Sequence, residues 1–360
     1  MKILHIITSL ATGGAEKLMV DLLPRLRDAG NDVELLCIDG TRTQFYQQLE
    51  TTGIKIHSLG KDVRMYNPWY ALKMAQLIRK GKYDIVHTHN TAPQLFAAIA
   101  KVLCSVVLCT TEHTTSNRRR DLRWYAPIDK WMYKQYGAII CISDKTEEFL
   151  RNYLGKGYYP ICTIYNGIDI NKFANARADE MLLKSKQTKQ AIVMVAGFRY
   201  QKDQDTVIRA MALLPRNSYD LWLVGDGERR KKLEELVRIY KLEDCVKFLG
   251  VRSDVPNVLK AADIVVMSSH WEGFGLAAVE GMAAKRPVIA SNTDGIAQVV
   301  AGAGLLFPHE DEKALAALIE RLAADDGLRQ RVVDACYKKA LQYDISVMAE
   351  KYNNLYKTLR

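Results

Sequence analysis

Two glutamates flank a glycine-containing turn late in the chain, and they are the side chains there best suited to chemistry. Seven residues separate Glu272 from Glu280 in the segment SHWEGFGLAAVEG, residues 269–281. Such a pair could transfer protons at one bond, hold a metal ion, or accept hydrogen bonds from hydroxyl groups. If a helix begins near Gly275, Glu280 lies within it and Glu272 in the preceding loop, so the carboxylates do not share a face. The spacing therefore favours two separate hydroxyl acceptors over an acid/base pair.

The turn between these glutamates could bind phosphate. The backbone amides of Phe274, Gly275 and Leu276 stand at the expected start of the helix, where N–H groups are unpaired and the helix dipole is positive. Carboxylates that accept sugar and ribose hydroxyls, placed beside a phosphate-binding turn, match the chemistry of a nucleotide sugar.

Two further glycine turns follow apolar runs. Gly13 and Gly14 precede a helical pattern early in the chain, where their amides could approach an anion or simply form a tight turn. The pattern is not GxGxxG, which disfavours a dinucleotide fold. Gly225, in the segment GDGE, ends a later apolar run and is weak evidence taken alone.

Cationic residues and histidines occupy other expected turns. Arg199 and Lys202, in AGFRYQKDQDTVIRA, could bind a diphosphate, the alternative being a solvated loop. His113, in CTTEHTT, could share a proton at neutral pH or be a structural hydrogen-bonded residue. His87 and His89 share a face of one expected strand, but no further ligand is evident nearby, so no metal is predicted.

A run of arginines with aromatic residues lies in NRRRDLRWYAPIDKW. Such a run could stack on bases, hold phosphates or rest on a membrane interface, and it could also be a solvated helix face. The residues concerned are Arg118, Arg119, Arg120, Arg123 and Trp124.

Short apolar runs alternate with longer amphipathic ones, which predicts parallel strands joined by helices. Two such series predict an α/β fold of two doubly wound domains, facing each other across a cleft, with ligands beyond the carboxyl ends of the strands. The polar stretch after Phe173 is the expected linker, so the domains are predicted as 1–173 and 174–343, with a helix in 344–360 that packs back on the first. The predicted strands are Ile3–Ile7, Val33–Ile38, Ile85–His89, Val106–Thr110, Ala138–Ile142, Ile161–Tyr165, Ile192–Ala196, Asp220–Val224, Val246–Leu249, Ile264–Met267 and Pro287–Ala290.

Composition places the chain among ordinary globular proteins. It has 360 residues, of which 48% are hydrophobic and 26% charged. The N-terminus lacks a secretory pattern, and the most apolar stretch, Leu95–Cys109, is interrupted and falls short of a membrane span. Seven cysteines without a CxxC pair indicate reduced thiols in a reducing compartment. The net charge of +10 favours anionic partners.

Taken in order, the motifs GGAE, EHTT, NGID, AGFRYQKD, VGDGE, FLG and HWEGFGLAAVEGMAAKRPVIAS closely resemble the family-4 glycosyltransferases over essentially the whole chain. These are retaining enzymes of the GT-B fold, with two Rossmann-like domains. The resemblance implies that Glu272 contacts hydroxyls of the transferred sugar and that Glu280 holds the ribose. It also implies that the amides of Phe274, Gly275 and Leu276, together with Gly13 and Gly14, approach the diphosphate.

The same resemblance implies roles for the remaining candidates. Arg199 and Lys202 would neutralise the leaving diphosphate, His113 would lie near the reacting centre, and the turn at Gly225 and the segment with Val251 and Arg252 would help to bind the donor. It implies no metal and no other cofactor.

Two departures from the family pattern are visible. The usual arginine five residues before the lysine is replaced by Gly197, so Arg199 would supply the charge from a shifted position. The usual Gly-Gly-x-Pro-Glu appears as residues 294–298, DGIAQ, which retain one glycine, Gly295.

The expected function is transfer of a sugar from a nucleoside-diphosphate donor, expected to be a UDP-sugar, to a glycan or polyprenyl-diphosphate-linked acceptor in cell-surface polysaccharide synthesis. The expected location is cytoplasmic, on the inner face of the cytoplasmic membrane, with the arginine run contacting acceptor or lipid. One alternative is an epimerase of the same fold, which would change the sugar without an acceptor. The other is a basic nucleic-acid-binding protein, which leaves both glutamates unexplained.

Overall fold

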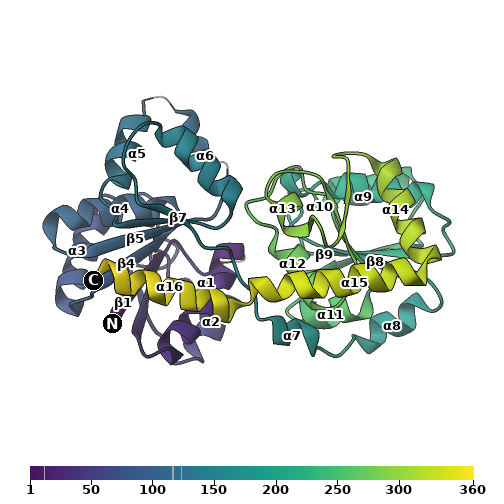
Figure 1. Cartoon of the computed structure of the whole chain (residues 1–360), viewed down its shortest axis with the longest axis horizontal. Coiled ribbons are helices and arrows are strands. Elements are labelled where there is room, and N and C mark those ends of the chain that lie inside the picture. Colours follow the sequence, from purple (N-terminus) through teal and green to yellow (C-terminus); the bar gives the residue numbers. More distant parts are fainter. Residues whose placement is uncertain (12, 116, 123) are drawn as a thin grey trace. The chain divides into compact units, whose positions relative to one another are not determined.

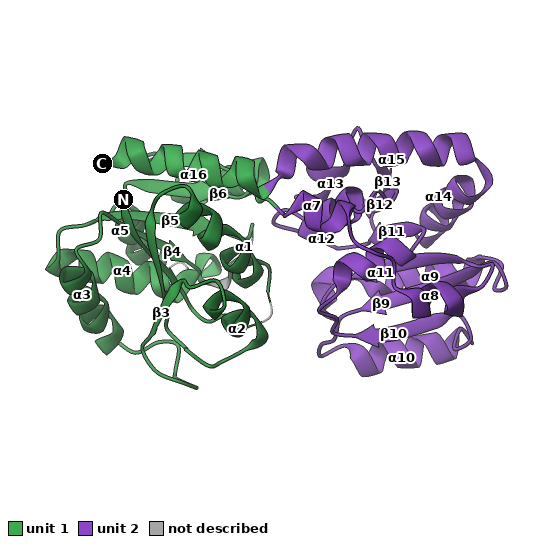
Figure 2. Cartoon of the chain, turned by 90° about the horizontal axis from the view of Figure 1, so that it is seen from below, with its two compact units in different colours: residues 1–167, 345–360 green, residues 168–344 purple. Residues whose placement is uncertain are grey.

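The computed structural model describes residues 1–11, 13–115, 117–122 and 124–360. The chain forms two compact units, of which the first combines Met1–Gly167 with Ile345–Arg360 and the second is Ile168–Asp344 (Figure 2). Each unit is built around one parallel sheet with helices on its faces (Figure 1).

The sheet of the first unit has the strand order β3-β2-β1-β4-β5-β6-β7, with all described pairs parallel. Starting the series in the middle and extending it to both edges is the doubly wound arrangement. The carboxyl ends of β1, β4 and β5 therefore lie side by side. The strands are β1 Lys2–Ile7, β2 Asp32–Cys37, β3 Lys55–Ser58, β4 Ile85–His89, β5 Val107–Glu112, β6 Ala138–Cys141 and β7 Ile161–Thr163.

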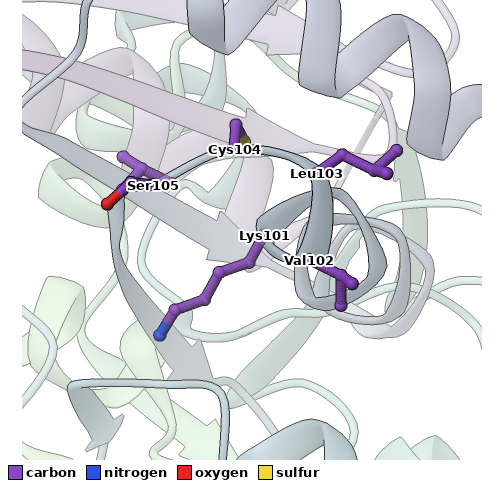
Figure 3. Close-up of a pocket in the computed structure, with 6 residues that line it drawn as sticks. Lys101, Val102, Leu103, Cys104 and Ser105 are labelled. Carbon is purple, nitrogen blue, oxygen red and sulfur yellow. The ribbon is translucent and has the colours of Figure 1, made fainter.

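Helices cover both faces of this sheet. The C-terminal helix α16 (Ile345–Leu359) packs beside α1 (Gly14–Asp28) in one core cluster, and the helices from α3 to α6 form the other cluster. A recess of about 420 Å³ lies at the end of α4, lined by Lys101–Val106 (Figure 3). The remaining elements are α2 Gln44–Glu50, α3 Trp69–Gly81, α4 Thr91–Leu103, η1 Arg118–Asp121, α5 Ala126–Tyr133 and α6 Asp144–Leu154.

The second unit repeats the plan with the order β10-β9-β8-β11-β12-β13, again parallel. Its strands are β8 Gln190–Val195, β9 Tyr219–Val224, β10 Val246–Gly250, β11 Ile264–Met267, β12 Val288–Ser291 and β13 Leu305–Phe307. Its helices are α7 Ile170–Ala174, α8 Glu180–Lys186, η2 Tyr200–Lys202, α9 Gln204–Leu213, α10 Arg230–Ile239, α11 Val255–Ala261, α12 Leu276–Ala283, α13 Ile296–Val300, α14 Glu312–Ala324, α15 Asp326–Ala340 and η3 Leu341–Tyr343.

Two strands were not predicted, and both are edge strands. β3 and β13 each end their sheet, and they are only three or four residues long and partly exposed. An edge strand needs less apolar surface than a central one, so its sequence pattern is weak.

The boundary between the units lies six residues before the predicted one, at Gly167 rather than Phe173. The reason is α7, which contains Phe173 and packs on α11 and α12 of the second unit. The polar stretch predicted as a linker also contains α8, capped by the Asp179 side chain, and so it belongs to the second unit. The helix α16 belongs to the first unit, where it packs on α1.

Candidate active site

The centre of the candidate site is an ion pair between Lys202 and Glu272. Glu272 lies in the loop between β11 and α12 and is only 6% exposed. Its Oε1 pairs with Nζ of Lys202 and accepts a hydrogen bond from Oγ of Ser269 at 2.9 Å. A buried carboxylate needs such partners, because burial without them strongly disfavours its charged form. The ion pair therefore brings one negative and one positive group into contact within the candidate site.

Strand order explains why two residues so distant in sequence meet. Lys202 follows β8, and β8 is the hydrogen-bonded neighbour of β11. Oγ of Ser268 donates to the backbone oxygen of Asp203 at 2.6 Å, and the amide of His270 donates to the oxygen of Gln201 at 2.9 Å. These bonds fasten the two loops together.

The turn after Glu272 places a helix N-terminus beside this pair. Gly275 is the N-cap residue of α12 with φ +90°, a conformation that favours glycine. Phe274 is buried, and its ring packs nearly perpendicular to that of Tyr343, with 5.2 Å between the ring centroids. Leu276 begins α12, and Glu280 lies one turn into it. A helix N-terminus attracts anions, because its first backbone N–H groups and the positive end of the helix dipole point towards them.

Gly295 is the one glycine that residues 294–298 share with the family's Gly-Gly-x-Pro-Glu motif, and its role is in packing. Its φ is +86°, and a Cβ atom there would lie 2.0 Å from the backbone oxygen of Glu272. The amide of Glu272 donates a hydrogen bond of 3.2 Å to the backbone oxygen of Asp294, the residue before Gly295. Only glycine lets the two loops approach this closely.

The turn at Gly225 supports the cationic loop. A Cβ atom on Gly225 would lie 2.1 Å from the oxygen of Ala196, and the amide of Phe198 donates to the oxygen of Asp226 at 2.9 Å. The loop held in this way carries Arg199, which is exposed and precedes η2. The guanidinium of Arg199 makes no ion pair with any residue that the structure describes.

The segment with Val251 and Arg252, predicted to help to bind the donor, offers one exposed side chain and one that is already paired. Val251 is 65% exposed, but the guanidinium of Arg252 already contacts the carboxylates of Asp179 and Asp254, each at 2.6 Å. The Arg252 side chain is therefore engaged within the protein.

In the first unit, the glycine turn and His113 follow the carboxyl ends of β1 and β5, two parallel strands that are separated in the sheet by β4. Gly13 is the N-cap residue of α1 with an extended backbone, and Gly14 begins that helix. His113 follows β5 and is half-buried, and burial lowers its pKa to about 4. Its imidazole is therefore neutral at pH 7.

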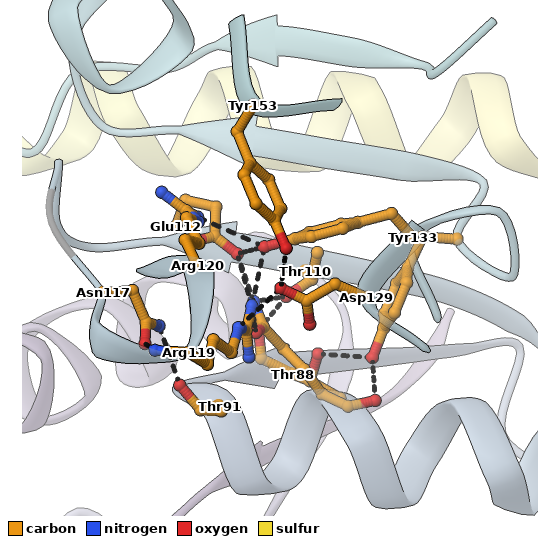
Figure 4. A network of polar contacts seen from close by, with 12 residues as sticks. Thr88, Thr91, Thr110, Glu112, Asn117, Arg119, Arg120, Asp129, Tyr133 and Tyr153 are labelled. Atoms are coloured by element: carbon orange, nitrogen blue, oxygen red, sulfur yellow. Dashed lines mark hydrogen bonds and ion pairs between the residues drawn. The ribbon is translucent and has the colours of Figure 1, made fainter. Parts of the chain in front are cut away.

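Two arginines of the predicted acceptor or membrane segment are not on the surface, which corrects that prediction. Arg119 and Arg120 enter a buried network with Glu112, Asp129 and Tyr133 (Figure 4). Nη2 of Arg120 lies 2.7 Å from Oε2 of Glu112, and Nε of Arg119 lies 3.1 Å from Oδ2 of Asp129.

The physical reason for the correction is charge compensation inside the protein. Although burial opposes ionisation, Arg120 and Arg119 keep the pKa of Glu112 below its ordinary value. Arginines that compensate buried carboxylates are not free to bind an acceptor or a lipid. Of the other predicted residues, Arg118 begins η1, Trp124 is 68% exposed, and Arg123 lies outside the described residues.

Comparison with known protein families decides the class. A family model described as Glycosyltransferase Family 4 matches residues 12–172, and one described as Glycosyl transferases group 1 matches residues 179–339. The chain belongs to the family-4 glycosyltransferases. The predicted family and enzyme class are thereby confirmed, and the alternatives are not favoured.

Relatives of this glycosyltransferase include enzymes of lipid-linked glycan synthesis. It is 27% identical to the UDP-Gal:alpha-D-GlcNAc-diphosphoundecaprenol alpha-1,3-galactosyltransferase of Escherichia coli, over 82% of this chain and 80% of the relative. It is 24% identical to the N,N'-diacetylbacillosaminyl-diphospho-undecaprenol alpha-1,3-N-acetylgalactosaminyltransferase of Campylobacter jejuni, over 93% of both chains.

Solved structures confirm the GT-B fold. The crystal structure of Anabaena HepE in complex with UDP-glucose matches with a TM-score of 0.86 at 23% identity, covering 99% of this chain and 100% of that one. The structure of WaaG, a glycosyltransferase involved in lipopolysaccharide biosynthesis, matches with a TM-score of 0.75 at 16% identity over 98% and 99% of the two chains.

Within the described part of the glycosyltransferase, two groups each bring three possible metal ligands together. In the first, His5, His87 and His89 are buried, and five of their six ring nitrogens form hydrogen bonds with one another, with His113 or with neighbouring hydroxyl groups; among the described residues, Nε2 of His5 has no partner. A metal needs unshared lone pairs that converge on one point, so this group fits a hydrogen-bonded cluster better. The second group, His270 with His309 and Glu310, is largely exposed. That the enzyme needs no metal remains a prediction.

Sequence reasoning missed the residues that hold the candidates in place. Ser269 fixes Glu272, Ser268 fastens the Lys202 loop, and His89 contacts His113. The serines carry no sequence signal of their own, because their role depends on the neighbouring strand. His89 had been considered only as a possible metal ligand.

Proposed function

We propose that this glycosyltransferase takes its sugar from a UDP-linked donor and delivers it, with retention of anomeric configuration, to a polyprenyl-diphosphate-linked glycan. The observation that carries the donor side is the Lys202–Glu272 pair at the N-terminus of α12. A diphosphate requires cations and amides, and a sugar requires carboxylate acceptors. Both kinds of group meet here.

The pair is suited to exchange partners when a donor binds. Without donor, Lys202 and Glu272 neutralise each other. A bound nucleotide sugar would bring phosphate oxygens to Lys202 and to the amides near Gly275, and sugar hydroxyls to Glu272. Positive charge held in advance at the leaving group stabilises the charge that develops there in the transition state.

Retention is proposed to proceed by attack on the face that the diphosphate leaves. A bond forms between the acceptor oxygen and the anomeric carbon, and the bond from that carbon to the phosphate oxygen breaks. The acceptor proton passes to the departing phosphate. Glu272 is not proposed as a covalent nucleophile, because its proposed role is to accept hydrogen bonds from hydroxyl groups of the sugar. Arg199, which is exposed beside Lys202, would add charge to the diphosphate site.

The proposed acceptor class rests on the relatives. The Escherichia coli and Campylobacter jejuni relatives are named for diphosphoundecaprenol-linked substrates, and the phosphatidyl-myo-inositol mannosyltransferase of Mycolicibacterium smegmatis, 26% identical over 96% of this chain and 90% of that one, also has a lipid acceptor in its name. An enzyme that extends such acceptors works at a membrane surface. No helix in the described residues combines the length and apolarity needed to cross a bilayer.

One face of the first unit is suited to that surface. Among its described residues, eleven large apolar side chains between Met65 and Trp131 are exposed, including Trp69 at 68%, Val102 at 71% and Trp124 at 68%. They lie on or beside the helices α3, α4 and α5, which cover one side of the sheet. Among the described residues of the opposite helix layer, formed by α1, α2 and α16, only Val347 is exposed in this way. Tryptophans in such positions favour the interface of a bilayer.

Charge points to the same face. Residues 61–135 contain thirteen lysines and arginines against five acidic residues. Leaving out the buried pairs of Arg119 with Asp129 and of Arg120 with Glu112, eleven basic and three acidic residues remain, an excess of eight positive charges. Anionic lipid contributes about 1 kcal/mol for each basic residue close to the membrane. This apolar and basic face replaces the arginine run as the proposed membrane contact.

Vesicle sedimentation tests the location. The double variant Trp69→Ser/Trp124→Ser should bind phosphatidylglycerol vesicles about tenfold more weakly than the unaltered enzyme, because it loses two large interfacial side chains. The matched control is Met181→Ser/Ile239→Ser, which removes apolar side chains of similar exposure from the second unit. Equal binding by all three proteins would contradict the proposed face.

A transfer assay tests the catalytic proposal. Glu272→Ala and Lys202→Ala should abolish sugar transfer from UDP-sugars to a polyprenyl-diphosphate-linked acceptor. Near-normal turnover in both variants would exclude the proposed roles. A thermal-shift screen of nucleoside diphosphates identifies the base, because a ligand of the folded state raises its stability. Stabilisation by a different diphosphate, and not by UDP, would refute the proposed donor.

A further inference from the structure

Three histidines of the first unit form a continuous hydrogen-bonded chain that ends at His113. Nδ1 of His5 lies 3.0 Å from Nε2 of His89, and Nδ1 of His89 lies 3.0 Å from Nε2 of His113. The ring planes of His5 and His89 differ by only 10°. The middle ring, His89, therefore directs Nε2 at His5 and Nδ1 at His113.

The sheet builds this chain. β1, β4 and β5 are adjacent and parallel, with His5 opposite His87 in the register and His89 opposite Thr111. His89 lies two residues beyond His87, so it points to the same face. His113 lies two residues beyond Thr111, where β5 has ended. Three neighbouring strands thus supply the three rings in sequence.

The protons of the chain must all be arranged in one direction. His5 and His89 are fully buried, and burial lowers the pKa of His5 to about 3 and that of His89 well below its ordinary value. A neutral imidazole has one N–H donor and one acceptor nitrogen. If one ring donates through Nδ1, its neighbour must accept at Nε2 and donate through its own Nδ1. Only two arrangements satisfy both contacts: all three rings protonated at Nδ1, or all three at Nε2.

The buried end of the chain distinguishes the two arrangements. Nε2 of His5 is buried and has no hydrogen-bond partner within the described part of the chain. Protonation at Nε2 throughout would leave an N–H group without an acceptor there, whereas protonation at Nδ1 leaves only a lone pair. Buried N–H groups without acceptors are rarer in proteins than under-satisfied acceptors.

We propose that His5 and His89 are positioning residues that hold His113 in the tautomer protonated at Nδ1. Nδ1 of His113 makes no hydrogen bond with any described residue, so it is the end of the chain that a ligand could reach. His113 then donates a hydrogen bond to an oxygen of the bound substrate and does not accept its proton. The tautomer is independent of the proposed donor and acceptor, and only the kinetic consequence rests on the proposed function.

Nitrogen NMR tests the tautomer directly in the full-length protein. Long-range proton–nitrogen correlation of ¹⁵N-histidine-labelled protein distinguishes protonated from bare ring nitrogens, and single substitutions assign the seven histidines of the chain. The expected result is a protonated Nδ1 and a bare Nε2 in His5, His89 and His113. A protonated Nε2 in His113, alone or in rapid exchange, would overturn the proposal whether or not any sugar is transferred.

Variants separate positioning from stability. His5→Leu removes the donor at the start of the chain, so the His113 tautomer should become mixed and kcat/KM should fall about tenfold, the effect of losing roughly one hydrogen bond. His5→Asn keeps a donor near the place of Nδ1 and should restore most of this loss. A His113 spectrum unchanged by His5→Leu would refute the coupling.

His87 provides the matched control. It is buried on the same face, but Nδ1 contacts the hydroxyl group of Tyr356 at 2.5 Å and Nε2 contacts Oγ1 of Thr111 at 2.8 Å, so it lies outside the chain. His87→Leu should lower thermal stability without altering the nitrogen signals of His113. Equal changes in the His113 signals for His87→Leu and His5→Leu would show a general loss of packing and would contradict the proposal.

Discussion

Replacing Lys202 with methionine removes the cation that faces Glu272 while keeping a side chain of similar length. Glu272 is 6% exposed and the Lys202 side chain 22% exposed, so the variant leaves a nearly buried carboxylate with Ser269 as its remaining side-chain donor. Breaking a fully buried pair costs about 3–5 kcal/mol, and exposed pairs contribute about 0–1 kcal/mol. With one buried partner and one at the edge, we expect a loss of about 2 kcal/mol of unfolding free energy.

Replacing the other partner of the ion pair, Glu272, should lower the free energy of unfolding by less. Glu272→Gln leaves Lys202 unpaired, but the ammonium group is partly solvated, so we expect a loss of about 1 kcal/mol. In the double variant neither charge remains, and its stability should be no lower than that of Glu272→Gln. For a unit of this size, 1 kcal/mol corresponds to about 2–4 °C in the melting temperature.

Scanning calorimetry and a transfer assay together check this reasoning. Both single variants should lose at least about 100-fold in kcat/KM, because Lys202→Met removes charge that stabilises the leaving diphosphate and Glu272→Gln removes the carboxylate that accepts sugar hydroxyls. The double variant should regain stability relative to Lys202→Met without regaining activity. A melting temperature for Lys202→Met within 1 °C of the unaltered enzyme, or strictly additive losses in the double variant, would refute the pairing.

Three further changes have distinct expected outcomes. Gly295→Ala should destabilise the protein by more than about 2 kcal/mol, because the new Cβ atom would meet the backbone of Glu272. The control Gly302→Ala, at φ +76° with open space around it, should cost about 1 kcal/mol, and calorimetry measures both losses. Arg120→Met should cost about 3 kcal/mol by leaving Glu112 undercompensated, and adding Glu112→Gln should recover part of it in the same measurement. Although burial of Glu34 opposes ionisation, hydrogen bonds from Tyr83 and His57 and the charges of Lys2 and Lys55 lower its pKa to about 2. Because this folded-state pKa is below the ordinary 4.5, the stability that Glu34 contributes is complete above about pH 4.5 and is lost as the pH falls towards 2. Melting temperatures of Glu34→Gln should therefore fall less steeply over that interval than those of the unaltered protein.

Much of the fold was predictable because its signals are local. Buried parallel strands are continuous apolar runs, and the eleven predicted strands all appear, with ends shifted by up to two residues. The strands that escaped prediction, β3 and β13, lie at sheet edges. The first compact unit ends six residues before the predicted boundary, because α7 is joined to the second unit by packing, which polarity alone does not indicate.

For the candidate site, the sequence identified residues and the fold determined their surroundings. The arginine run illustrates the difference: charge and spacing suggested a surface, but Arg119 and Arg120 face Glu112 and Asp129, which come from β5 and α5. Whether a charged residue is solvated or compensated depends on what lies opposite it, and sequence distance does not show this.

By itself, the sequence determined the family, the two-domain α/β plan and the identity of Glu272, Lys202 and His113 as candidates, because motifs and hydrophobic periodicity are properties of short segments. Only the tertiary structure decided that Lys202 and Glu272 form one ion pair, since the contact depends on β8 lying beside β11. The same holds for the chain from His5 to His113, which requires β1, β4 and β5 to be neighbours. Parallel strands bring residues together through sheet order, and sheet order is set by the packing of the whole unit.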